Sequence, residues 1–579
     1  MTFALQGESP SDARAGLRRW SSALGVSLGT AILIVTPFFW RGNASGHDIA
    51  FHASSWLDVA EQWKEGIVYP RWCRWANNGF GEPRFIFYPP LSWTLGAALG
   101  LVAPWSAVPA LFIVLVQTLA GISMFALARR FFPPAPALFS AACYAGNPYA
   151  LLVVYLRSDF AELLACALLP MLVLAAVELC GLIENRRRST SRVAAILAFL
   201  FACIWLSNAP AGVISSYSMA LLFVWAAIRA KSFAPVWRGA GGLTLGFGLA
   251  GFYLVPALYE QRWVNIRQAL APGLEPAQNF LYTTIGDPEH NTFNGIASSV
   301  AMLLTALTTI AALLARSAFE NRDDGKAARR LCGVMVLLGV AAVVLMIRPS
   351  SLLWELLPEL RFIQFPWRWT GMVAVPYSFF AAAALARARV RWIWASVLIL
   401  AVAGTATFLV RKAWWDSDDI PALEDAIRSG QGFDGTDEYD PISDDRTDLP
   451  QKAPELELLP AQDAQPSPPR VEIRMVRRTA EERELLLTSP HPGRLAIRLL
   501  DYPAWRVLVN GRPVKPQSRG TTTQMILPLP AGTNRIEITF VRTLDRTVGS
   551  WLSSVGGLAL AAAFWGVPLE EFRKGFRAG

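Results

Sequence analysis

The chain has 579 residues, of which 53% are hydrophobic and 17% are charged, and its mean hydropathy is +0.34. Soluble globular domains carry about 25% charged residues, so this composition excludes a water-soluble globular protein. The net charge of +9 does not indicate a nucleic-acid partner. The lysines and arginines lie mostly between apolar blocks, as the positive-inside rule for membrane proteins predicts.

Apolar blocks of roughly 18–22 residues recur along the chain, a length that crosses a hydrocarbon core of ~30 Å. We therefore predict a polytopic α-helical membrane protein with twelve spans, at 21–40, 106–128, 135–156, 160–182, 193–206, 213–228, 239–258, 296–314, 331–347, 370–386, 392–410 and 549–567. Basic clusters at 129–130, 186–188 and 387–391 then face the cytoplasm, which places both termini there. The stretch 89–102 is short and opens with two prolines, so we predict an interfacial or re-entrant helix.

Two regions lie outside these spans on the extracytoplasmic side. The first is a long loop at 41–88, which belongs to the transmembrane domain 1–410. The second begins with an acidic and then proline-rich segment, 411–470, which we expect to be irregular. Residues 471–548 alternate polar and apolar side chains, and Asn510-Gly511 is a strong hairpin signal. We predict a small C-terminal β-sandwich-like domain there, followed by the final helix and tail, 549–579.

The first outer loop carries acidic and histidine side chains soon after the first span. If its residues 48–61 are helical, Asp48 and His52 share one face. Together with His47 they could bind a divalent cation such as Mg²⁺ or Mn²⁺, with Asp48 and His52 as the main ligands. Alternatively, Asp48 is a general base near the interface, or it only caps the amphipathic helix that follows it.

A second polar group follows the third span. Arg157, Asp159 and Glu162 lie at its outer end, so the topology puts Asp48 and Asp159 on the same membrane face. Two carboxylates from separate loops could share a metal or divide acid and base roles. Asp159 could equally be a helix-terminal residue paired with Arg157. Glu162 lies one turn into an apolar helix, where burying a carboxylate is costly without a function.

A third polar group precedes the tenth span. Arg361, Gln364 and Arg368 flank an aromatic stretch at the outer interface. Guanidinium groups there could bind a lipid phosphate or diphosphate in a bidentate manner. They could also extend to ordinary lipid headgroups, as long basic side chains do.

Short motifs along most of the chain resemble those of a known family. The matching stretches are 47–48 with the loop to 88–91, then 157–159, 361–368, 435–439 and 502–511. The chain resembles YfhO-like proteins and the related family of 6-pyruvoyl-tetrahydropterin synthase-related membrane domains, within the GT-C superfamily of membrane glycosyltransferases. The resemblance implies a GT-C-like bundle. It makes Asp48 the base that activates the acceptor, Asp159 the second-loop acidic residue, and the arginines the donor-phosphate ligands. Many active members have two acidic residues where this chain has His47-Asp48, which leaves the metal open.

The expected function is transfer of a sugar from a polyprenyl-phosphate donor to an envelope lipid or glycan acceptor. Arg361 or Arg368 would stabilise the departing phosphate. The expected location is the outer face of a bacterial inner membrane, with membrane lipids as partners. Two alternatives are a lipid or glycan transporter or flippase, whose charges usually lie at the bilayer midplane, and a non-catalytic membrane scaffold.

Overall fold

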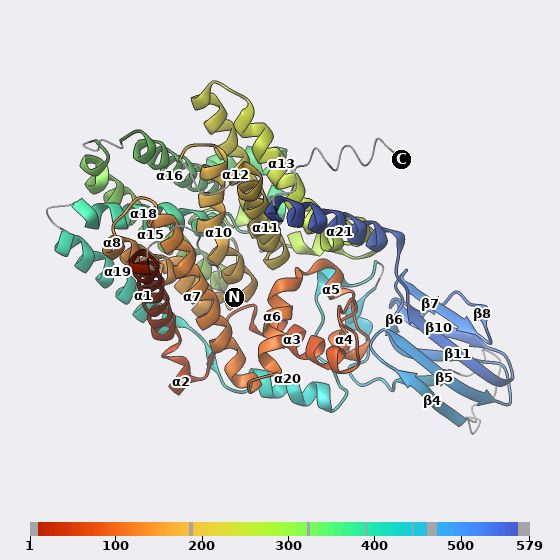
Figure 1. The fold of residues 1–579 in the computed structure, drawn as a ribbon. Coiled ribbons are helices and arrows are strands. Elements are labelled where there is room, and N and C mark those ends of the chain that lie inside the picture. The colour runs from red at the N-terminus through yellow and green to blue at the C-terminus, as the bar shows by residue number, and fades with distance from the viewer. Residues whose placement is uncertain are drawn as a thin grey trace, which may run out of the picture.

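The computed structural model describes residues 10–183, 189–320, 325–387, 391–442, 444–459 and 472–565. The basic triplet 186–188 and the prolines of 460–469 lie outside these residues. Figure 1 shows a helical body with a β-domain attached at one side. The first outer loop lies between the two.

Eleven helical segments of the described chain are long and apolar enough to cross a membrane. The predicted spans are confirmed at eleven of their twelve positions, and a bent pair of helices occupies the twelfth. The helices of these segments are α1 (Pro10–Val35) with α2 (Phe38–Arg41), α7 (Val108–Ala128), α8 (Pro134–Ala145) with α9 (Pro148–Leu152), α10 (Phe160–Leu179), α11 (Thr190–Ser207), α12 (Ala209–Ala230), α15 (Pro288–Glu320), α16 (Gly325–Met346), α18 (Thr370–Arg387), α19 (Arg391–Lys412) and α21 (Leu544–Trp565).

The seventh span, predicted at 239–258, falls on two helices with a break between them. Helix α13 (Ala234–Leu249) and helix α14 (Gly251–Glu260) meet at an angle of 75°. The break follows a glycine-rich stretch, and glycine weakens a helix because of its backbone freedom. Glycine also allows α21 to approach the break. A Cβ added to Gly549 of α21 would lie 2.5 Å from the carbonyl oxygen of Gly251.

The first outer loop is largely helical. It contains α3 (Ile49–Lys64), α4 (Ala76–Gly79), α5 (Arg84–Phe87) and, beyond it, α6 (Pro90–Gly100). Helix α6 has 11 residues, too few to cross the bilayer, so the prediction of a non-spanning helix is confirmed. It packs on α3 where Gly96 meets the ring of Trp56.

The described part of the C-terminal domain has a sheet ordered β3-β6-β10-β9 and a second ordered β4-β5-β11-β7-β8. The hairpin predicted at Asn510-Gly511 joins β7 to β8, and both turn residues have positive φ. Strand β3 comes from the segment 411–470, which was expected to be irregular and which also contains helix α20 (Asp419–Arg428). Helix α17 (Ser351–Leu356) lies upstream of this segment, before α18. The strands are β3 (Leu456–Leu459), β4 (Glu472–Arg478), β5 (Glu482–Ser489), β6 (Gly493–Leu500), β7 (Trp505–Val509), β8 (Arg512–Pro513), β9 (Gln517–Ser518), β10 (Gln524–Leu529) and β11 (Gly532–Phe540).

The β-domain shares its hydrophobic core with the first outer loop. Trp72, Phe80 and Phe87 of the loop belong to the same buried cluster as Tyr502 and Phe540 of the β-domain. The ring of Trp72 lies 5.3 Å from that of Trp505. A short pairing of β1 (Asn43–Ala44) with β2 (Trp415–Asp416) also ties the start of this loop to the second extracytoplasmic segment.

A buried ion pair fastens the β-domain to the helical body. Arg546 of α21 donates to both carboxylate oxygens of Glu260 of α14, at 2.7 and 2.8 Å. The hydroxyl of Tyr502, in the β-domain, donates to the same carboxylate at 2.7 Å. All three side chains are buried, so the pair is closed to water.

A candidate active site at one end of the helix bundle

The first and second outer motifs are joined through their backbones. The N–H of Asp48 donates to the carbonyl of Arg157 at 2.8 Å, and the N–H of Gly46 donates to Oγ of Ser158 at 3.0 Å. A Cβ added to Gly46 would lie 2.5 Å from the backbone of Arg157, so only glycine allows this approach. A π-helical turn, Val153–Arg157, and the left-handed Ser158 turn the chain at this point.

Arg157 is the centre of the site. Its Nη2 lies 2.6 Å from Oδ2 of Asp48 and 3.2 Å from Oδ2 of Asp159. Its guanidinium also lies over the rings of Phe365 and Trp367, at 5.3 Å from each. The Arg157 side chain is 5% exposed, whereas that of Asp48 is 33% exposed. Asp48 is therefore the part of this group that a substrate can reach.

Arg368 joins the same group from a 3-10 turn, Pro366–Trp369, just before α18. Its Nη2 lies 3.4 Å from Oδ2 of Asp159, and its Nε lies 3.3 Å from Oε2 of Glu162. Its Nη1 donates to the carbonyl of Ile363 at 3.0 Å and to Oε1 of Gln364 at 3.4 Å. Gln364 also donates to the carbonyl of Ala269 at 2.7 Å, so it links Arg368 to the preceding outer loop. A direct contact of Gln364 with a ligand stays a prediction.

The two aspartates differ in what their carboxylates do. Asp48 occupies the N-cap position of α3, but its side chain makes no capping hydrogen bond. Asp159 does cap its helix, because its Oδ1 accepts from the N–H of Glu162 at 2.9 Å. Burial raises the pKa of the Asp159 carboxyl, but His52 and the two guanidinium groups outweigh it and hold that pKa below its usual range. Asp159 thus acts as a fixed anion.

The side chains of the two histidines contact residues other than Asp48. The Nε2 of His52 lies 3.7 Å from Oδ1 of Asp159, and its ring packs edge-on against Phe160. The ring of His47 packs on Phe293, and burial and then the charge of Arg157 lower the pKa of His47. Among the described residues, no group of three or more His, Cys, Asp or Glu side chains is arranged to hold a metal ion. Divalent-cation binding by Asp48 and His52 stays a prediction.

Tyr88 is a neighbour of the site that the sequence analysis did not assign to it. Its ring packs against Phe51 at 4.6 Å and against His52 at 5.8 Å. Burial, followed by the charges of Asp159 and Asp48, raises the pKa of its phenol. The proline pair that follows Tyr88 was the signal that could have drawn attention to it, because it ends the loop at this point.

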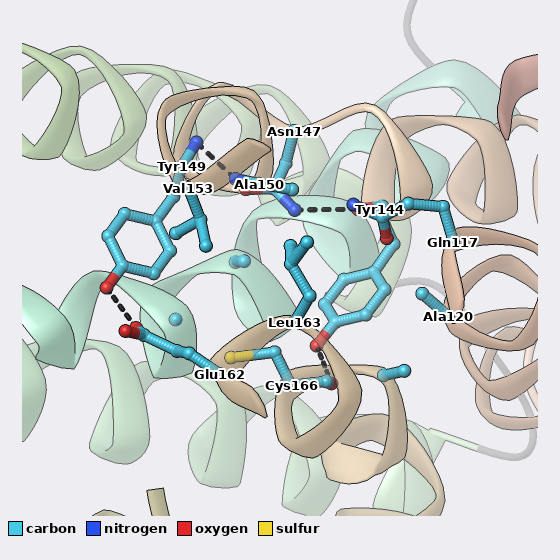
Figure 2. Close-up of a pocket in the computed structure, with 13 residues that line it drawn as sticks. Gln117, Ala120, Tyr144, Asn147, Tyr149, Ala150, Val153, Glu162, Leu163 and Cys166 are labelled. Carbon is cyan, nitrogen blue, oxygen red and sulfur yellow. Dashed lines mark hydrogen bonds between the residues drawn. The ribbon is translucent and has the colours of Figure 1, made fainter. Parts of the chain in front are cut away.

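Glu162 lies deeper in the bundle than the aspartates, between two small pockets. The Tyr149 hydroxyl donates to it, as Figure 2 shows. The first pocket is lined by polar groups of Gln117 and Asn147 as well as by apolar side chains. The second pocket is also lined by Glu162, together with Asn208 and Arg368. The carboxylate thus supports Arg368 from inside the membrane domain.

The structure does not bring Arg361 into this group. Its side chain is exposed, and its guanidinium lies 5.0 Å from the ring of its neighbour Phe362. Within the described residues it makes no ion pair with the site carboxylates. Gln364, which lies between the two arginines, has a positive φ of 65°. Binding of a donor phosphate by Arg361 stays a prediction.

Comparison with known proteins gives matches to solved structures and a match to a protein family. An arabinofuranosyltransferase, AftD from Mycobacteria, is 17% identical with a TM-score of 0.42, over 68% of this chain and 26% of that one. The archaeal oligosaccharyltransferase AglB from Archaeoglobus fulgidus is 13% identical with a TM-score of 0.39, over 72% of this chain and 56% of that one. This chain thus spans about a quarter of the first and about half of the second. Comparison with curated protein sequences gives no match.

The sequence itself matches a protein family over residues 85–414, more than half of the chain. That family is described as the 6-pyruvoyl-tetrahydropterin synthase related domain, a membrane protein. The matched range contains Arg157, Asp159, Glu162 and Arg368, which the fold gathers beside Asp48. The family expected from the motifs is confirmed, and the chain belongs to the 6-pyruvoyl-tetrahydropterin synthase related family of membrane proteins.

Proposed function

We propose that the chain is an integral membrane glycosyltransferase. It would move a sugar from a polyprenyl-phosphate donor to an envelope lipid or glycan acceptor, at the outer face of a bacterial inner membrane. The observation that carries the proposal is the pairing of Asp48 with Arg157. An accessible carboxylate is held at 2.6 Å by a buried guanidinium, beside a second guanidinium from another loop. A base and a phosphate ligand are what such a transfer requires.

The reaction follows from these groups. The Asp48 carboxylate takes the proton of an acceptor hydroxyl, and the acceptor oxygen forms a bond to the anomeric carbon of the sugar. The bond from that carbon to the phosphate oxygen breaks, and polyprenyl phosphate leaves with the electron pair. Arg157 and Arg368 offset the charge that develops on the leaving phosphate. The acceptor attacks from the opposite side of the sugar, so the configuration at the anomeric carbon inverts.

The pairing of Asp48 with Arg157 also gives the reaction an order. A phosphate binds a guanidinium in bidentate fashion, so an arriving donor competes with Asp48 for Arg157. Asp48 is one third exposed, and Arg157 is also held by Asp159. Arg157 can therefore change partner without moving far. Donor binding frees the base, so the enzyme activates an acceptor only when a donor is in place.

The distribution of charge supports the outer face. Arg130 pairs with Glu178 at the ends of α7 and α10 opposite to the site, and basic residues mark the cytoplasmic end of membrane helices. A bent pair counted as one span gives twelve crossings. An even number returns both termini to one side, which the proposal takes as the cytoplasm.

The experiment is a comparison of envelope glycolipids by mass spectrometry. A deletion strain of the host carries the wild-type protein, Asp48→Asn, or the control Asp425→Asn at matched membrane levels. Asp425 is exposed and pairs with Arg428, so its replacement changes one surface charge only. We expect a sugar-sized mass to be lost in the deletion and Asp48→Asn strains and present in the other two.

A mass that Asp48→Asn restores would refute the assignment of the base. If purified Asp48→Asn protein also moved a lipid-linked sugar across vesicles, the transporter alternative would replace the transferase. If no mass changes in the deletion strain, the scaffold alternative replaces both.

A further inference from the structure

Two arginines stand directly opposite each other in the β-domain. Arg478 of β4 and Arg483 of β5 are paired residues of the antiparallel ladder. Opposed residues project to the same face with their Cβ atoms about 4.5–5.5 Å apart, and like charges in this position destabilise a sheet. The pair therefore needs a compensating charge.

Arg483 is also buried, with 5% of its surface exposed. Its Nη1 donates to the carbonyl of Arg498, on β6 of the other sheet, at 3.1 Å. Burial is the main cause that lowers the pKa of Arg483 to about 10. Glu455 opposes this shift, and the charges of the neighbouring arginines add to it. A buried guanidinium beside other cations is costly unless an anion joins it.

The first outer loop completes the group. Arg74 lies over the ring of Trp75 at 4.8 Å and pairs with Glu65 at 2.5 Å. The guanidinium of Arg498 lies against the loop at Gly79, where an added Cβ would come within 3.1 Å of its Cζ. We call Arg74, Arg478, Arg483 and Arg498 the junction cluster, since they come from the first outer loop and from strands β4, β5 and β6. Figure 1 shows this loop beside the β-domain.

The charges of the junction cluster are not balanced by its ion pairs. Arg478 pairs with Glu455 at 2.8 Å and Arg74 with Glu65. Glu65 also accepts from the N–H of Ala480 at 2.8 Å. In the described residues, four guanidinium groups thus meet two paired carboxylates, an excess of two positive charges. Arg483 and Arg498 donate to the carbonyls of Arg498 at 3.1 Å and Ala453 at 3.3 Å, which accept hydrogen bonds but carry no compensating negative charge.

We propose that the junction cluster is a binding site for an oxyanion, a phosphate or carboxylate group. Arginine presents paired donors that match both groups. The group could be carried by a soluble envelope component or by a lipid headgroup. This site is separate from the candidate active site and does not depend on the proposed transfer reaction.

The test uses the full chain in phosphatidylcholine nanodiscs. Inorganic phosphate and glucuronate are titrated by calorimetry, and the melting temperature is followed in parallel. Potassium chloride at equal ionic strength is the control for screening. We expect saturable binding of at least one oxyanion, with a higher melting temperature, and neither effect with chloride. In a second set of nanodiscs, phosphatidylglycerol replaces part of the phosphatidylcholine. If the lipid is the source, it raises the melting temperature and phosphate then binds more weakly.

Variants separate binding from folding. Arg478→Gln changes a side chain that is 41% exposed and should weaken oxyanion binding about tenfold, because a charged hydrogen bond is lost. Glu455→Gln removes the competing carboxylate and should tighten binding. Arg535→Gln is the matched control, since Arg535 lies in the same domain and pairs with Glu484.

The Glu455→Gln variant best distinguishes an oxyanion-binding site from an interdomain ion network. If it lowers the melting temperature and leaves oxyanion binding unchanged, the cluster is an interdomain ion network and the proposal fails. Absence of saturable binding, or equal losses in Arg478→Gln and Arg535→Gln, would also overturn it. None of these variants touches Asp48 or Arg368, so the transferase proposal stands or falls separately.

Discussion

Arg546 and Arg157 are both buried arginines, but they are paired in different ways. Arg546 donates two hydrogen bonds to one fully buried carboxylate, which Tyr502 also satisfies. Arg157 donates from Nε and Nη2 to one oxygen of the part-exposed Asp48 and from Nη2 to Asp159 as well. Its Nη1 has no hydrogen-bond partner among the described atoms. A closed pair holds elements in place. An open pair has donor capacity left for a ligand, which is the feature to look for when a function is sought.

The largest effect we expect is on the rate of sugar transfer, when the open pair of Asp48 and Arg157 is changed. Asp48→Asn should reduce sugar transfer by about 10²- to 10⁴-fold, the usual contribution of a general base. Donor binding should persist or tighten, because the carboxylate that competes for Arg157 is gone. Transfer rate and lipid-donor affinity of the purified protein measure the two effects. Weaker donor binding in this variant would contradict the exchange of partners at Arg157.

The closed pair should respond in stability instead. Arg546→Gln leaves the Glu260 carboxylate buried without its cation, which should cost about 3–5 kcal/mol. The midpoint of denaturation in detergent measures this loss. Adding Glu260→Gln to the same chain should restore part of it. If Arg546→Gln is as stable as the wild type but inactive, the Arg546–Glu260 pair serves the reaction and not the stability of the fold.

A buried carboxylate with neutral partners provides a third case. Asp58 accepts from Gln62 at 2.5 Å and from the N–H of Trp75 at 2.9 Å, and burial raises its pKa from 3.8 to about 6. The folded protein therefore binds this proton more tightly than the unfolded chain does. Stability from this group is complete below pH 4 and is lost between about pH 4 and 6, by roughly 3 kcal/mol at most. Melting temperatures across this range test it, and Asp58→Asn should flatten the profile.

The smallest effect we expect is from the close approach of Gly46 to the backbone of Arg157, which brings Asp48 beside Arg157. Gly46→Ala should push the first loop away from Arg157, at a cost of about 1–3 kcal/mol for overpacking. The rate of transfer should fall by a larger factor than this loss of stability alone explains, because Asp48 moves away from Arg157. Gly29→Ala is the control, since a Cβ at Gly29 meets nothing within 4 Å. Equal activity in both variants would show that the site tolerates movement of the loop.

Much of the fold follows from local patterns in the sequence. Apolar length identified the spans, and the Asn510-Gly511 turn identified a hairpin. Basic residues placed Asp48 and Asp159 at one end, where Arg157 joins them. These signals are local, so a single sequence carries them.

The features that were missed depend on distant contacts. The bend at Ala250 accommodates α21, which lies about three hundred residues later. The exposure of Arg361 and the burial of Arg368 depend on how the outer loop before α18 packs. The place of Tyr88 beside Asp48 and Asp159 depends on how the first loop folds over the second. Apolar length and charge do not encode such contacts.

The core that Trp72, Phe80 and Phe87 share with the β-domain has a consequence for biosynthesis. More than four hundred residues separate Phe80 from Phe540. At about 5–20 residues per second, the loop emerges roughly half a minute or more before the strands that cover it. During that interval its aromatic side chains stay in contact with water, lipid or a chaperone. The protein therefore completes its first loop last, and premature release of the chain should leave that loop sensitive to proteases.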